Sequence, residues 1–291
     1  MSRLTVPKTY KLFIGGKFPR SESGRSIPIL ALKGETVAHI CHASRKDFRE
    51  AVEAASSASP SWAGMTGYLR GQILYRMAEM LEARREEFAT SICITKDVTV
   101  AIARNEVNAS IDRLVSFAGW TDKYQQVLGC QNSVASDFYN FTVPEPQGVT
   151  CVVAPDDPPL LGLVTLLAAP LCAGNTVVAV GSQKHPIPTA IFGEVCHTSD
   201  VPAGVINLLT GTRGELLEHI ASHRQVSSIS AAALTKADRI TIEVGASDSI
   251  KRVCFSTLQH KEWYDPVLAA SPWSIEPFVE MKTIWHPSAV H

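Results

Sequence analysis

The sequence has no excess of charge of either sign. Among 291 residues, 27 lysines and arginines nearly balance 28 aspartates and glutamates, and the formal net charge is −1. Proteins that bind nucleic acids or anionic membranes usually carry a basic face. The balance therefore argues against both kinds of partner, and any partner must be recognised by shape.

Long apolar runs and paired cysteine motifs are also missing. The longest apolar run, residues 160–172, is too short to span a bilayer and contains Pro170. The first residues lack the apolar core of a secretion signal, so we expect a cytoplasmic protein. The seven cysteines are odd in number and show no CxxC spacing, which predicts reduced thiols. His219 and His223 have helical spacing but no third ligand, so we expect no metal site.

The first part of the chain, up to about residue 130, is predicted to be mainly helical after a short β-hairpin within residues 11–30. Ser44, followed three positions later by Asp47, predicts the N-cap of an alanine-rich helix. A second helix is predicted from Thr66, with one apolar stripe that extends to Phe88. A third apolar stripe, at residues 107–118, predicts another helix.

From Gly148 onward, β-branched runs alternate with helical segments. This alternation predicts an α/β fold with a doubly wound parallel sheet covered on both faces. Ligands of such sheets bind at the carboxyl ends of strands, here near Pro155, Ser182 and Gly211. The predicted strands are residues 148–155, 175–180, 204–211, 226–231 and 240–245, with 251–258 as a further candidate, while 258–274 looks like loop.

Several segments resemble signature segments of the aldehyde dehydrogenase superfamily, over residues of about 12–245 and 278–285. They begin with a Trp-Ala pair followed by an arginine- and glutamate-rich helix. The other segments are Phe-Ala-Gly-Trp-Thr-Asp-Lys-Tyr at 117–124, Pro-Glu-Pro-Gln-Gly-Val at 144–149, Ala-Gly-Asn-Thr-Val-Val at 173–178, Pro-Ala-Gly-Val-Ile-Asn at 202–207 and Val-Glu-Met-Lys-Thr-Ile-Trp at 279–285.

The resemblance implies a Rossmann-like nucleotide domain with an N-terminal helical region and a β oligomerisation arm. It also implies NAD(P)-dependent oxidation of an aldehyde to a carboxylic acid through a cysteine thiolate. We accordingly divide the chain into the N-terminal hairpin and helices of the nucleotide domain at 1–136, an oligomerisation hairpin at 137–150, a Rossmann-like α/β portion at 151–258, and a linker with the C-terminal oligomerisation strand at 259–291.

The cofactor and oxyanion positions implied by the resemblance are altered. Asp157 replaces the asparagine that would hold the oxyanion, and its charge would repel one. The N-cap of a helix beginning at Pro158 or Pro159 explains Asp157 more simply. The ribose-binding Lys-Pro-Ser-Glu segment appears as residues 180–183. The candidate cofactor-binding residues are therefore Pro155, Val180, Ser182 and Gln183. We expect NAD or NADP to bind weakly if at all.

Val180 has no donor for a ribose hydroxyl, whereas Gln183 could still bind one. A core-facing valine and a solvated glutamine are the favoured interpretation. The phosphate-binding turn matches residues 231–234 without its glycine, and Asp238 takes the place of a second glycine. The stretch 231–243 looks too short for the helix expected there, so we expect no phosphate-facing helix terminus.

The catalytic groups are the most altered part. Glu243 matches the family's glutamate base at a strand end, although a solvated or paired glutamate is the favoured interpretation. Cys254 follows Glu243 too closely to match the nucleophile and lies in a strand-like run, where a buried thiol is expected. The nicotinamide-ribose segment is also missing. We therefore expect that a catalytic domain of roughly two hundred residues is absent before the closing strand.

This pattern resembles the truncated second module of two-module aldehyde dehydrogenases, here as a separate chain. The leading hypothesis is a pseudoenzyme subunit, inactive by itself, that docks on and stabilises a complete aldehyde dehydrogenase in a hetero-oligomer, or forms a homodimer, through residues 138–143 and 279–285. Two alternatives remain open. One is an NAD(P)-dependent aldehyde dehydrogenase acting alone, and the other is a nucleotide-binding regulatory module.

Overall fold

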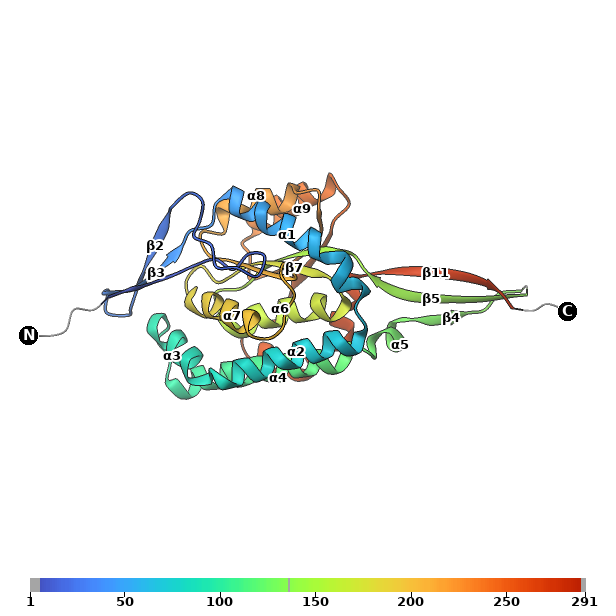
Figure 1. The fold of residues 1–291 in the computed structure, drawn as a ribbon, viewed down its shortest axis with the longest axis horizontal. Coiled ribbons are helices and arrows are strands. Elements are labelled where there is room, and N and C mark those ends of the chain that lie inside the picture. The colour runs from blue at the N-terminus through green and yellow to red at the C-terminus, as the bar shows by residue number, and fades with distance from the viewer. Residues whose placement is uncertain (1–5, 136, 289–291) are drawn as a thin grey trace, which may run out of the picture.

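Five parallel strands in the order β10-β9-β6-β7-β8 form the central sheet of the computed structural model (Figure 1). The structure describes residues 6–135 and 137–288, so the residues 1–5 that bear on the secretion-signal prediction lie outside it. The predicted doubly wound sheet is confirmed. Its strands are β6 (Val149–Val153), β7 (Thr176–Val180), β8 (Ile206–Leu209), β9 (Val226–Ala232) and β10 (Arg252–Ser256).

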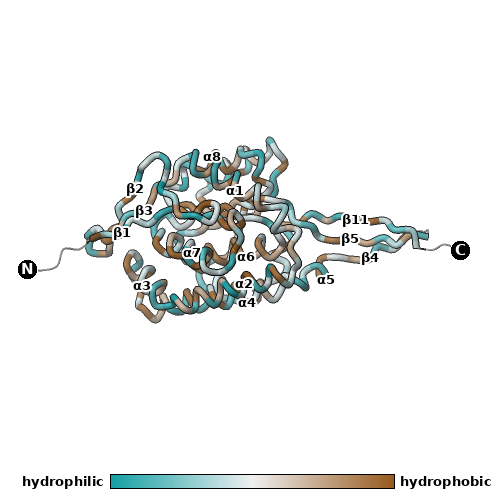
Figure 2. The backbone as a smooth tube through the Cα atoms, viewed as in Figure 1, coloured by the Kyte–Doolittle hydropathy of each residue, from teal (hydrophilic) through white to brown (hydrophobic). Residues whose placement is uncertain are grey.

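Helices cover both faces of this sheet (Figure 1). One face carries α6 (Pro159–Ala173) and α7 (Ile187–His197), with an outer layer of α2 (Gly67–Ala83), α3 (Arg85–Thr95) and α4 (Val100–Trp120). The other face carries α1 (Arg45–Gly64), α8 (Gly214–Ser222) and α9 (Lys236–Ser247). Because α6 lies between the sheet and α4, it is buried along its whole length. Figure 2 shows the apolar residues gathered in these inner layers.

The predicted helix starts at Ser44 and Thr66 are confirmed. Ser44 and Asp47 form a reciprocal capping box, and Thr66 accepts a hydrogen bond from the N–H of Leu69. The predicted second helix is wrong in extent, because the chain leaves helical geometry at Arg84 (ψ 16°) and Phe88 belongs to α3. The apolar spacing continues across this break, so the pattern alone did not reveal it. A short helix, α5 (Tyr124–Leu128), follows α4.

Residues 240–245, predicted as a strand, are part of helix α9. The buried side chains of this segment are Ile242 and Ala246, which have helical spacing, whereas Ile240 and Val244 are exposed. This segment was predicted as a strand because its apolar β-branched residues alternate with polar residues, which is the pattern of a half-buried strand. The prediction that no helix follows the turn at 231–234 is therefore also wrong, and β10, the further candidate, is the strand that follows.

The two segments predicted to form an arm are paired. β5 (Phe138–Pro146) is antiparallel to β11 (Val279–Pro287) on one side and to β4 (Cys130–Asn132) on the other. This three-stranded sheet projects away from the helices (Figure 1). Asn175 fixes its base: Oδ1 accepts from the N–H groups of Gln147 (2.7 Å) and Gly148 (2.9 Å), and Nδ2 donates to the Phe278 carbonyl (2.8 Å).

The predicted N-terminal hairpin is wrong in its pairing. β2 (Ser26–Leu30) is antiparallel to β3 (Thr36–Cys41), which was not predicted, and β1 (Lys8–Tyr10) is parallel to β3. Within residues 11–18 only the single bridge between Ile14 and Lys17 forms. The segment predicted as loop before β11 contains short helices: η1 (His260–Tyr264), α10 (Pro266–Ala269), η2 (Pro272–Ser274) and η3 (Glu276–Phe278).

A buried carboxylate from α4 caps the N-terminus of α6. Glu106 Oε1 accepts hydrogen bonds from the N–H groups of Leu160 (2.8 Å) and Leu161 (3.3 Å), and only 1% of Glu106 is exposed. The predicted cap by Asp157 is wrong, because Asp157 pairs with Lys96 instead. Burial raises the pKa of Glu106, although the two N–H groups and Lys96 act in the opposite direction.

Replacing Glu106 should separate its role as an acceptor from its charge. Glu106→Ala leaves two buried N–H groups without an acceptor and should lower the free energy of unfolding by about 2–3 kcal/mol. Glu106→Gln keeps an acceptor oxygen and should cost less. Urea unfolding of the two variants measures the difference.

The same variants test the charge. Because the folded-state pKa of Glu106 lies above its ordinary value of 4.5, its contribution to stability is complete below pH 4.5 and is lost as the pH rises through the folded pKa. Glu106→Gln should lack this part of the pH dependence. Equal losses in both variants, with the pH profile unchanged, would show that Glu106 is neither a cap nor a titrating group.

Candidate functional site

The loops that follow β6, β7 and β8 meet around the carboxylate of Asp156. Its Oδ1 accepts hydrogen bonds from Ser182 Oγ (2.9 Å) and from the N–H groups of Gln183 (2.8 Å) and Lys184 (3.1 Å). Arg213 Nη2 donates to the same oxygen at 2.6 Å. The carboxyl ends of three neighbouring strands are therefore joined by one side chain.

The surroundings of Asp156 stabilise its ionised form. Burial by itself would raise the pKa of Asp156, but the Arg213 charge and the hydrogen bonds from Lys184, Ser182 and Gln183 outweigh it and lower the pKa. Donors that would otherwise be free to meet a ligand hydroxyl or phosphate are thus engaged by the protein. Asp156 and Arg213 were missed in the sequence, where the adjacent Asp156-Asp157 pair was the only available signal.

The predicted cofactor residues do not converge on an open site. Val180 is 1% exposed and lies in the core, and Pro155 is buried against Gly162 of α6. Ser182 is fully buried, and its hydroxyl binds Asp156. Gln183 is exposed, but its Oε1 accepts from the N–H of Arg213 (3.1 Å). Binding of a ribose here would require these contacts to be exchanged for contacts with the ligand.

The turn after β9 has one residue in a conformation that favours glycine, and the helix that follows it is already capped. Ala233 has a φ of 52°, the left-handed conformation that glycine adopts without strain. The terminus of α9 is already capped: Thr235 Oγ1 accepts from the N–H of Asp238 (3.1 Å) and donates to its carboxylate (2.8 Å). A phosphate at this helix terminus would meet the negative charge of Asp238.

The predicted catalytic groups lie apart. Glu243 is exposed in the middle of α9, not at a strand end. Cys254 on β10 packs against the core on the α6 side of the sheet, whereas α9 covers the other side. The strand that follows α9 is β10, and it ends at Ser256.

The other predicted catalytic position is neutralised. The carboxylate of Asp157 is mostly exposed and binds Lys96, whose Nζ also lies 3.9 Å from Glu106 Oε2. Among the described residues, no three His, Cys, Asp or Glu side chains are close enough together to hold a metal ion. No helix in the described part of the chain is both long and apolar enough to cross a membrane.

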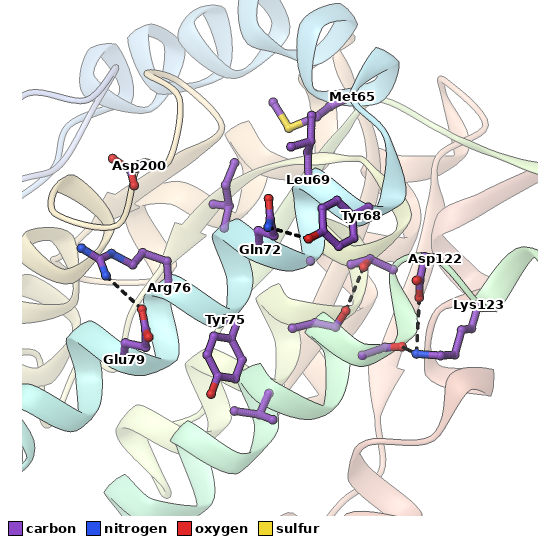
Figure 3. A pocket seen from close by; sticks show the side chains of 16 residues that line it. Met65, Tyr68, Leu69, Gln72, Tyr75, Arg76, Glu79, Asp122, Lys123 and Asp200 are labelled. Carbon is purple, nitrogen blue, oxygen red and sulfur yellow. Dashed lines mark hydrogen bonds and ion pairs between the residues drawn. The ribbon is translucent and has the colours of Figure 1, made fainter.

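A surface groove lies in the outer helical layer, between α2 and α4 (Figure 3). Its volume is about 790 Å³, and Tyr68, Leu69 and Tyr75 contribute exposed apolar surface. Two ion pairs lie along it, Arg76–Glu79 (3.0 Å) and Asp122–Lys123 (3.4 Å). Four of the five charged side chains that line the groove are thus paired, Asp200 being the fifth, and the groove is separate from the strand ends.

Comparison with known proteins decides the family. The model of the aldehyde dehydrogenase family matches residues 20–257. The chain belongs to the aldehyde dehydrogenase family. The match ends just after β10, so most of the segment that leads to β11, and β11 itself, lie beyond it.

Known members of the aldehyde dehydrogenase family are similar in sequence to most of this chain. Human mitochondrial 10-formyltetrahydrofolate dehydrogenase is 28% identical over 87% of the chain, and chicken retinal dehydrogenase 2 is 31% identical over 84%. The chain spans only 28% and 48% of these two relatives. An NAD⁺ complex of a Bacillus cereus aldehyde dehydrogenase is 26% identical with a TM-score of 0.80, and covers 85% of this chain and 50% of that one.

Removing the Asp156 carboxylate should destabilise the strand ends. Asp156→Ala leaves Arg213, Ser182 and two N–H groups unpaired, and the free energy of unfolding should fall by about 2–4 kcal/mol. Glu79→Gln, in the exposed pair with Arg76, should change it little. Because the folded pKa of Asp156 lies below 3.8, its contribution is present above pH 3.8 and is lost as the pH falls through the folded pKa. Urea unfolding across the acid range would refute this if Asp156→Ala matched Glu79→Gln.

Cys254 should be a slow nucleophile. It lines a cavity of about 250 Å³ with Thr165 and Ser230, and burial raises the pKa of its thiol. The exposed Cys130 on the arm is the internal reference. At neutral pH, iodoacetamide should alkylate Cys254 at least about tenfold more slowly than Cys130, as followed by peptide mass spectrometry. Faster alkylation of Cys254 would restore it as a candidate nucleophile.

Proposed function

We propose that this aldehyde dehydrogenase family chain is a non-catalytic subunit that docks on a complete aldehyde dehydrogenase and stabilises it. The observation that carries the proposal is the arm. Its sheet order is β11-β5-β4, so the nine-residue strand β11 is paired on one side only within the described residues. Unpaired strand edges tend to be covered by another chain.

Apolar side chains along the arm support the same role. The register between β11 and β5 puts Met281 and Trp285 on one face, opposite Pro144 and Asn140. Phe138 lies on this face too, with its ring centroid 5.9 Å from that of Trp285. Met281, Trp285 and Phe138 are 44%, 58% and 43% exposed. Large apolar side chains gathered beside a strand edge are typical of a protein interface.

The strand-end geometry supports the lack of catalysis. Aldehyde oxidation through a thioester needs a thiolate and a base that reach the same carbon. Cys254 and Glu243 lie on opposite sides of the sheet, and the strand end at Ser256 carries no carboxylate. We therefore place the function of this chain in assembly, with any oxidation of aldehyde carried out by the partner.

NAD or NADP enters this proposal only as a weak ligand. The Bacillus cereus relative binds NAD⁺ with the same fold. In this chain, however, Val180, the engaged Asp156 and the acidic cap Asp238 do not fit a ribose and a pyrophosphate. Calorimetric titration at millimolar NAD distinguishes the regulatory-module alternative, which requires heat of binding. NADH formation from aldehydes by the isolated chain would support the alternative of an independent enzyme.

The decisive experiment is co-expression of the tagged chain with a complete aldehyde dehydrogenase, followed by native mass measurement. A hetero-oligomer that is more resistant to heat than the complete enzyme alone is expected. Formation of a homodimer that does not bind the complete enzyme would instead support self-association through the same arm. A stable monomer in both settings would overturn the proposal.

Variants of the arm test the interface itself. The double variant Met281→Ser with Trp285→Ser should weaken the hetero-oligomer by at least about tenfold, because it removes large apolar side chains from one exposed face. Tyr139→Ser, whose residue lies on the opposite face by register, is the matched control and should retain the complex. Co-purification yields and unfolding temperatures are compared. Equal yields for all three proteins would show that this face is not the interface.

A further inference from the structure

A second cavity opens at the carboxyl ends of β9 and β10. Its volume is about 610 Å³, within the range of roughly 300–1,000 Å³ that suits small organic ligands. The strand ends contribute Ala231, Ala232 and Phe255, and Pro158 lies at the start of α6. The facing wall is the segment that contains η1, with Trp263 and Tyr264.

This wall follows the part of the chain that the family model matches. The family match ends at residue 257, and residues 258–264 lie beyond it. The wall is also anchored: Trp263 is 2% exposed, and its carbonyl accepts from Nη2 of the buried Arg113 (2.8 Å). A capping box between Gln259 and Glu262 closes the first turn of η1. The cavity is thus bounded on one side by strand ends within the family match and on the other by an anchored segment beyond it.

The cavity has more positive than negative charge. Asp157 is the one carboxylate among the side chains that line it, and it is paired with Lys96. The Arg239 guanidinium lies 4.4 Å from the centre of the Phe255 ring, and no acid within the described residues pairs with it. Lys261 likewise has no acidic partner in the described part of the chain. The nearby Asp238 carboxylate is held by Thr235.

We propose that this cavity binds a small organic anion with a flat apolar body, of the aromatic carboxylate class. The Arg239 guanidinium stacks on the Phe255 ring, so its N–H groups point outward in the plane of the guanidinium. A carboxylate can accept hydrogen bonds from two of these N–H groups at once. Lys261 supplies a second charge. Phe255 and Tyr264 supply aromatic surface for a ring. Docking on a partner protein is not required for this binding.

The test uses the full chain and a matched pair of probes. 2-Naphthoate carries the proposed charge and shape, and 2-naphthamide has the same shape without the charge. Isothermal titration should show the acid binding at least about tenfold more tightly than the amide. No binding of the acid at millimolar concentration, or equal binding of both probes, would overturn the proposal.

Variants assign the charge to its residues. Arg239→Gln should reduce the preference for the acid about tenfold, and Lys261→Gln should reduce it less, because lysine lacks a paired N–H edge. Arg49→Gln, on exposed α1 surface, is the control and should leave affinity unchanged. Unfolding temperatures confirm that each variant is folded. An unchanged preference in Arg239→Gln, or competitive displacement of the acid by NAD at lower concentration, would assign the cavity to another ligand.

Discussion

The Asp156 carboxylate is the interaction on which the ligand side of this sheet depends. A doubly wound sheet leaves polar backbone groups at its strand ends, where relatives of the same fold receive a nucleotide. Here a side chain of the protein takes those donors and joins the loops after β6, β7 and β8 with Arg213. The contacts that hold the loops together therefore engage Ser182 and the N–H of Gln183, two of the residues predicted to bind a ribose.

A second constraint couples the arm to the body. Asn175 begins the approach to β7 and binds both the start of β6 and the residue that precedes β11. The arm is thus fixed at its base by a fully buried side chain, while its outer edge has no partner within the described residues. A rigid base with an open strand edge suits a subunit that contributes a strand to another chain. The arm is already ordered, so docking would cost little additional conformational entropy.

The groove between α2 and α4 and the cavity at the ends of β9 and β10 differ in how their charged side chains are paired. In the groove between α2 and α4, both bases, Arg76 and Lys123, are paired with acids. At the ends of β9 and β10, Arg239 and Lys261 come from elements far apart in sequence, α9 and η1. Asp157, the one carboxylate that lines this cavity, is paired with Lys96.

The alternation of β-branched runs and helices, the caps at Ser44 and Thr66 and the arm segments were predictable, because each depends on local periodicity or on neighbours a few residues away. The sequence alone also determined the family and the separation of Cys254 from any nucleophile motif. Helix α9 was mistaken for a strand, since its burial depends on packing against the sheet. Only the tertiary structure decided that Glu106 caps α6, that Asp156 binds Arg213, and that Cys254 and Glu243 face opposite sides. Each of these findings concerns the spatial distance between residues that are far apart in the chain. A single sequence contains no information about such spatial distances.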